Sequence, residues 1–173
     1  IETGVITVSG DAFTGCTGLK SFSAASDLAF STARHDLLRD CASLEKLSVR
    51  SLTKENNYLN GLFGGRAQAL TELKIGRLDE IPEQLCANIV TLESITVGEL
   101  ATPVVGDRAF INCSALKTFD VNAKIIGVGA EAFRNTAIES FDGEKLEYLG
   151  NGAFAANPSL KTFTFNENFT AVP

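Results

Sequence analysis

A short apolar motif recurs along the chain at nearly constant spacing. Each copy has an apolar anchor, a second apolar residue three positions later and a small or apolar residue two positions after that, as in LESITV at residues 92–97. Seven copies begin at residues 19, 44, 70, 92, 116, 138 and 160, so consecutive copies lie 22 to 26 residues apart. A period of this length predicts a solenoid, in which each unit buries its apolar face by stacking on its neighbours.

The second half of each copy predicts a short strand, because its apolar and polar residues alternate with a period of two. Successive copies lie one turn apart and run in the same direction. They therefore predict one parallel sheet of about seven short strands, with neighbours about 4.8 Å apart. Ile6 and Val8 alternate in the same way and predict part of a preceding strand.

A large apolar residue stands six positions before the anchor in several copies. We expect this residue on the side of the solenoid opposite the strands. We expect a helical turn there, with the phenylalanine rings stacked inside. Leu85 is expected to take this place in the fourth copy, and Phe133 stands one residue out of step in the sixth. The residues in step are Phe13, Leu38, Phe110 and Phe154. The glycines expected to supply backbone freedom for a tight bend here are Gly10, Gly106, Gly127, Gly129, Gly150 and Gly152.

A third column lies three residues before the anchor and contains three of the four cysteines. Its members are Cys16, Cys41, Ala67, Ile89, Cys113, Asn135 and Asn157. Because asparagine shares the column, we expect small buried side chains that bond to the main chain of the turn. We expect buried free thiols here and at Cys86, with a Cys16–Cys41 disulfide as the alternative. No C-x-x-C pair occurs, so the cysteines do not indicate zinc.

Two turns are lengthened, by residues 26–36 and 52–61, and such insertions often carry binding. Residues 32–40 predict a short helix, and residues 53–57 predict a polar loop. The single histidine, His35, is expected at the surface rather than beside a catalytic cysteine. Residues 61–66, GLFGGR, lack the Lys-Ser or Lys-Thr ending of a phosphate loop and predict a turn.

Three stretches of the chain resemble the repeats of BspA-like leucine-rich repeat proteins. They read GDAFTGCTGLKSF at residues 10–22, GDRAFINCSALKTF at 106–119 and GAFAANPSLKTF at 152–163. The resemblance covers nearly the whole chain. It implies a leucine-rich repeat horseshoe, that is, an α/β solenoid with one parallel sheet of about seven short strands and helical turns and loops on the convex side. Residues 1–173 are expected to form a single domain of this kind.

The resemblance also implies a secreted or cell-surface protein that acts in adhesion or other protein contact. It carries over no catalytic residue and no cofactor. Composition narrows the partners: 15 basic and 21 acidic residues give a net charge of −6, which argues against nucleic acid. No apolar run approaches the roughly 20 residues of a membrane helix. The chain contains no methionine, so we expect a piece of a longer product.

The residues expected on the outward face of the sheet form two charged clusters. The candidate partner-binding residues are Lys46, Arg50, Glu72 and Lys74 in a basic cluster, and Asp120, Asp142 and Glu144 in an acidic one. The acidic cluster has oxygen ligands of the kind that Ca²⁺ prefers, which makes a calcium site an alternative. Charge complementarity across such a surface sets specificity and association rate.

These observations predict a non-catalytic interaction module that binds a host or bacterial surface protein, or a glycan, through the solenoid surface. A structural spacer within a larger surface protein is the alternative. A carbohydrate-active enzyme on a parallel β-helix is a third possibility, but it needs converging carboxylates. The two clusters are expected about three turns apart, roughly 14 Å, which is too far for one acid–base pair. The identity of the partner and the oligomeric state stay open.

Overall fold

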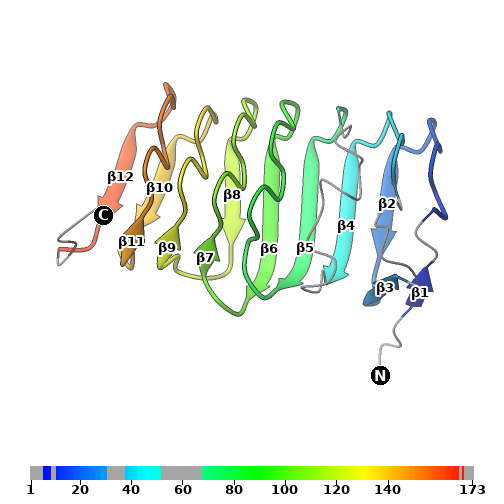
Figure 1. Cartoon of the computed structure of the whole chain (residues 1–173), viewed down its shortest axis with the longest axis horizontal. Coiled ribbons are helices and arrows are strands. Elements are labelled where there is room, and N and C mark those ends of the chain that lie inside the picture. Colours follow the sequence, from blue (N-terminus) through cyan, green and yellow to red (C-terminus); the bar gives the residue numbers. More distant parts are fainter. Residues whose placement is uncertain (1–5, 9–10, 31–37, 52–67, 168, 170–173) are drawn as a thin grey trace.

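The computed structural model describes residues 6–8, 11–30, 38–51, 68–167 and 169 of the 173-residue chain. Figure 1 shows a stack of turns in which each turn contributes a strand to a row along the long axis of the molecule. The described strands are β1 (Ile6–Val8), β2 (Ser21–Ala24), β3 (Leu28–Phe30), β4 (Lys46–Ser51), β5 (Glu72–Leu78), β6 (Ser94–Leu100), β7 (Val104–Val105), β8 (Thr118–Val121), β9 (Gly127–Val128), β10 (Ser140–Gly143), β11 (Tyr148–Leu149) and β12 (Thr162–Phe165).

The seven predicted strands of the repeat are all present, as β2, β4, β5, β6, β8, β10 and β12. We call this row the front. Five of them form one parallel sheet in the order β2-β4-β5-β6-β8, and the register aligns the second apolar residues, as in Leu73 with Ile95 and Ile95 with Phe119. β10 and β12 form a separate parallel pair. The prediction of one sheet of about seven strands is therefore wrong in one respect, because the front is divided between β8 and β10.

Two further parallel sheets were not predicted. β7, β9 and β11 form a three-stranded sheet where each chain turn leaves the front, and an isolated bridge joins Ile81 to Val105 at its edge. β1 pairs with β3, which confirms the strand predicted at Ile6 and Val8. Its partner β3 lies inside the insertion at residues 26–36.

The predicted helical turns are absent from the described part of the chain. On the side opposite the front, alternate N–H groups donate to the next turn rather than within their own turn. Cys86 N bonds to Ala109 O, Phe110 N to Ala132 O and Phe133 N to Ala153 O, each over 2.8 Å. An α-helix would need those N–H groups for its own i to i−4 bonds. Of the helix predicted over residues 32–40, residues 38–40 form a turn and the rest lie outside the described residues.

Most of the glycines predicted at the tight bends are required because the main chain of the preceding turn lies too close for a Cβ. A positive φ is not the reason for most of them. Of those predicted to need backbone freedom, Gly152 alone among the described residues has a positive φ, of 64°. A Cβ on Gly106 would lie 2.5 Å from Glu83 N, and one on Gly129 would lie 2.6 Å from Asp107 N. Gly150 meets the preceding turn in the same way, whereas Gly127 has ordinary contacts and Gly10 lies outside the described residues.

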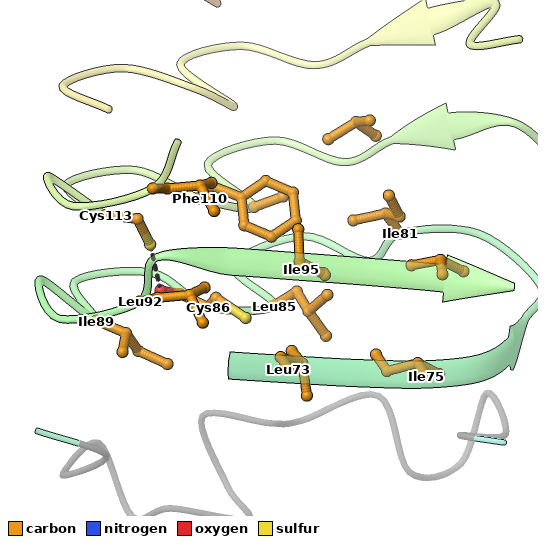
Figure 2. Close-up of a cluster of buried hydrophobic side chains, with 14 of the residues drawn as sticks. Leu73, Ile75, Ile81, Leu85, Cys86, Ile89, Leu92, Ile95, Phe110 and Cys113 are labelled. Carbon is orange, nitrogen blue, oxygen red and sulfur yellow. Dashed lines mark hydrogen bonds between the residues drawn. The ribbon is translucent and has the colours of Figure 1, made fainter. Parts of the chain in front are cut away.

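The side of the solenoid opposite the front is called the back. The core is a continuous stack of apolar side chains between the front and the back. Figure 2 shows its aliphatic part, where Leu73 and Ile95 from the front meet Leu85, which fills the predicted back position. Towards the C-terminus the same positions hold phenylalanines. The back rings stack as predicted, with centroids 5.3 Å apart for Phe110–Phe133 and 5.1 Å for Phe133–Phe154.

Two cysteines of the column of small residues bond to the main chain of the preceding turn, which confirms the predicted main-chain bonding for these two. Cys41 Sγ donates to Phe13 O over 3.2 Å, and Cys113 Sγ donates to Cys86 O over 3.0 Å, the dashed line in Figure 2. The four cysteines are free, so the disulfide alternative is not realised. Three are buried, but Cys16 is exposed, which corrects the prediction for that residue. Burial raises the pKa of the Cys113 thiol to about 12, which disfavours the reactive thiolate.

Candidate binding surface

Three of the predicted basic-cluster residues meet on neighbouring strands of the front sheet. Lys46 on β4 lies opposite Glu72 on β5, with Nζ 3.1 Å from Oε2, and Lys74 pairs with the other carboxylate oxygen. Hydrogen bonds from Lys74 and Lys46 lower the pKa of Glu72. Both lysines stay exposed, at 63% and 56% of their side-chain surface. Two cations share one carboxylate, so this surface carries net positive charge.

Arg50 belongs to a separate contact at the end of β4. Its Nε lies 3.4 Å from Asp27 Oδ1, and Ser51 Oγ donates to the same oxygen over 2.6 Å. Arg50 therefore does not gather around Glu72 as expected. It anchors the segment that follows β2 against the front sheet.

The acidic cluster contains a cation that sequence reasoning missed. Lys124, in the loop after β8, pairs with Asp142 and also lies 3.7 Å from Glu144 Oε2. The hydrogen bond to Asp142 raises the pKa of Lys124, and the same bond lowers the pKa of Asp142. Lys124 lies in a connecting loop, outside the strand residues predicted on the outward face of the sheet, so the repeat pattern gave no reason to select it.

Asp120 is separated from the other two predicted acids. It lies on β8, where its register partner is Thr96, and it is exposed without an ion pair in the described part of the chain. The calcium alternative required three carboxylates to converge. Instead, Lys124 neutralises the Asp142 side, and no group of three or more potential ligands among the described residues could hold a metal ion.

A groove of about 400 Å³ lies where the front is divided between β8 and β10. Phe119, Val121 and Phe141 supply apolar walls, and Asn122, Ser140 and Asp142 supply polar groups. Lys124 also lines it and spans the division by pairing with Asp142. Figure 1 shows that the ribbons of β8 and β10 are more widely spaced than those of the other neighbouring front strands.

We call the segment between the left-handed residue of each turn and the next anchor the corner. At the division between β8 and β10 this corner is one residue shorter than at the preceding turn. A left-handed residue precedes the anchor by four positions at Asn112–Leu116, but by three at Asn135–Ile138. This places Thr136, not Asn135, in the column of small residues, where its hydroxyl donates to Phe133 O over 3.2 Å. Phe133 is therefore in step with the other back rings, and the chain enters β10 one residue early.

All the other front junctions begin with the same pair of main-chain hydrogen bonds, and the junction after the short corner lacks this pair. At each of those junctions one carbonyl accepts two successive N–H groups of the next turn, as Glu93 O does from Lys117 N over 3.0 Å and from Thr118 N over 3.1 Å. The carbonyls are those of Lys20, Glu45, Thr71, Glu93 and Glu139. The equivalent Lys117 O has no such pair. Ala137 N donates to Leu116 O over 3.0 Å instead.

The displaced Asn135 joins a ladder of three asparagines at the same corners. Asn112 Nδ2 donates to Asn88 Oδ1 over 2.9 Å, and Asn135 Nδ2 donates to Asn112 Oδ1 over 3.1 Å. All three have left-handed backbones, with φ of 65°, 60° and 56° for Asn88, Asn112 and Asn135. Asparagine tolerates this conformation better than most residues, which explains its recurrence here.

The match to a known protein family agrees with this repeat architecture. A family model for the BspA type leucine rich repeat region matches in six copies, over residues 1–104 and 79–173. The chain belongs to the BspA-type leucine-rich repeat family. Members of this family generally serve as interaction or scaffold modules and are typical of bacterial surface proteins. No curated protein and no solved structure matches the chain.

In the described part of the chain, no helix has the length and apolar character that a membrane span requires. His35, the predicted polar loop at residues 53–57 and the predicted turn at residues 61–66 lie outside the described residues.

Proposed function

We propose that this chain is a non-catalytic interaction module of a secreted or cell-surface protein and binds a protein or glycan partner in adhesion. The observation that carries the proposal is the exposed Lys46–Glu72–Lys74 cluster on β4 and β5. Family membership supports an interaction role, because the family is generally non-enzymatic.

The framework beneath this cluster favours recognition by a preformed surface. β4 and β5 pair along five registered positions, and their inward residues Leu47, Leu73 and Ile75 are buried. A preorganised surface loses little conformational entropy on binding, which favours affinity. The net positive charge of the cluster selects a partner with an acidic surface and speeds encounter with it.

The test is saturable binding of the chain to a panel of matrix proteins and glycans by surface plasmon resonance. The test variant carries Lys46→Glu and Lys74→Glu. The matched control carries Lys117→Glu and Lys145→Glu, which changes net charge equally at exposed positions outside β4 and β5. Circular dichroism checks that each protein is folded.

We expect binding that the test variant loses and the control keeps. Binding that both variants keep would move the site away from the β4–β5 surface. Binding that both lose equally would indicate attraction by net charge alone. No binding to any member of the panel would favour the structural spacer instead.

A further inference from the structure

We propose that the groove between β8 and β10 binds an extended peptide segment, which adds a strand to the divided front sheet. This proposal goes beyond the proposed function, because it concerns a different surface and names the chemistry of the partner. It rests on the main-chain groups at the division, on the lining of the groove and on the charges at its rim.

The main-chain argument starts from the alternation of a parallel ladder, in which successive residues bond to opposite neighbours. On β8, Thr118 bonds back towards β6, as its N–H to Glu93 O shows. Phe119 therefore directs its N–H and C=O groups towards β10, and Val121 directs its N–H there, while the Val121 carbonyl accepts a bond from Ala123 N over 2.7 Å. On β10, Ser140 and Asp142 direct theirs towards β8. In the described part of the chain no ladder joins these two strands.

Two facing strand edges that no ladder joins define the occupant. An extended peptide supplies both N–H and C=O groups at the strand repeat, and peptides bind exposed sheet edges in this way. A sugar or a small anion would not match a row of alternating donors and acceptors.

The groove gives such a peptide side-chain contacts as well. Its volume of about 400 Å³ lies within the usual range of ligand sites. Phe119 and Phe141 are already stacked beneath it, with centroids 6.2 Å apart. Because those rings fill the core below, the inward side chains of the peptide should be small and apolar, such as valine.

The rim selects a basic peptide. Asp120, Asp142 and Glu144 lie on or beside the two strands, and Lys124 is the cation paired with Asp142 and Glu144. Side chains alternate along a strand, so a peptide with inward valines presents every second residue outward. Lysine at those positions would meet Asp120, which has no ion pair in the described part of the chain, at a rim where three carboxylates face one cation, Lys124.

The probe is a capped hexapeptide of alternating lysine and valine, added to the ¹⁵N-labelled chain and followed by amide NMR. We expect saturable shifts and slowed exchange at the amides of Phe119, Val121, Ser140 and Asp142. The matched control peptide has N-methylated valines, which keeps its charge and apolar surface but removes half of its main-chain donors. It should bind at least about tenfold more weakly, because three main-chain donors are lost and each lost bond weakens binding by at least about twofold.

Two protein variants complete the test. Asp120→Asn removes an exposed rim charge and should weaken binding by up to about fivefold. Insertion of one serine between Thr136 and Ala137 restores the longer corner, so β8 and β10 should pair with each other and binding should be lost. Circular dichroism and the unchanged amide spectrum of β4 and β5 show that each variant is folded.

Equal binding of the N-methylated peptide would overturn strand addition and leave only charge attraction. Shifts confined to β4 and β5 would also overturn the proposal, while supporting the surface described under the proposed function. Failure of the protein panel with successful peptide binding would reject the proposed β4–β5 site and keep the groove. The two proposals can therefore fail separately.

Discussion

The junction between β6 and β8 and the junction between β8 and β10 join turns of similar sequence, yet only the first is closed by a ladder. Four registered pairs join β6 to β8, beginning at Ser94 and Thr118. The second junction has no registered pair in the described chain. The corners differ by one residue, Cys113-Ser-Ala-Leu116 against Thr136-Ala-Ile138.

The core behaves differently from the front when the divided β8–β10 junction is compared with the paired β10–β12 junction. Back rings keep nearly equal spacing across the turns, at 5.3 Å for Phe110–Phe133 and 5.1 Å for Phe133–Phe154. Front rings lie 6.2 Å apart for Phe119–Phe141 but 5.5 Å apart for Phe141–Phe163. Stacking in the core therefore continues where pairing at the surface is lost, and the pairing is lost at the junction that follows the short corner.

The largest effect should come from removing a core ring that serves both sides of the division. Phe133 contacts Phe110, Phe154, Phe119 and Phe141 and is fully buried. Phe133→Ala should lower the free energy of unfolding by about 3–5 kcal/mol, and Leu92→Ala by about 2–5 kcal/mol. Urea unfolding measures both. Phe165→Ala is the control, because that side chain is 56% exposed and its loss should cost far less.

A smaller effect should follow from filling the close approach between back turns. A Cβ on Gly129 would meet Asp107 of the preceding turn, so Gly129→Ala should lower the unfolding free energy by about 1–3 kcal/mol. Gly127→Ala, two residues away, meets only ordinary side-chain contacts at 3.4 Å or more. Equal midpoints for the two variants in thermal unfolding would contradict the close-approach explanation.

Changing the length of one corner should convert one junction into the other. Inserting serine after Thr136 should add main-chain bonds between β8 and β10, each contributing about 0.5–1.5 kcal/mol to the unfolding free energy. Deleting Ser114 should open the β6–β8 junction and destabilise the chain by a similar amount per bond. Urea unfolding of the pair gives the sign, and opposite signs are expected. A destabilising insertion would argue that other features hold β8 and β10 apart.

The smallest effect should be the pH dependence of the surface ion pairs. Lys74 and Lys46 lower the pKa of Glu72 below its unfolded value, so their contribution is present above the unfolded pKa. It is lost as the pH falls through the folded pKa. Glu72→Gln should therefore flatten the acid side of the stability profile slightly in urea unfolding from pH 3 to 7. An unchanged profile would show that the pair contributes no measurable stability, as for many exposed pairs.

Much of the fold follows from the sequence period. The seven front strands, the strand at Ile6–Val8 and the stacked back rings were predictable, because strand alternation and the 22–26-residue spacing are local properties of the chain. The absence of helices in the described turns was not predictable in this way. The destination of an N–H group such as that of Phe110 depends on the next turn, which lies over 20 residues away.

The candidate surface was predictable only in part. Lys46, Glu72 and Lys74 meet because they occupy registered strand positions. Arg50 instead pairs with Asp27, and Lys124 joins the acids from a loop outside the repeat columns. The division of the front left one visible trace in the sequence, the displacement of Phe133 from its anchor. That displacement reports the shortened corner after Phe133, not a shift of the ring itself.

The most direct test of this account is the hydrogen exchange of three equivalent front amides, measured by NMR on the unmodified chain. Thr118 N and Thr162 N begin closed junctions through Glu93 O and Glu139 O, at 3.1 and 3.3 Å. Ser140 N is their counterpart at the division. The account predicts slow exchange at Thr118 and Thr162 and fast exchange at Ser140. Protection of Ser140 equal to that of Thr118 would contradict it, because the front would then be one continuous sheet without a peptide groove.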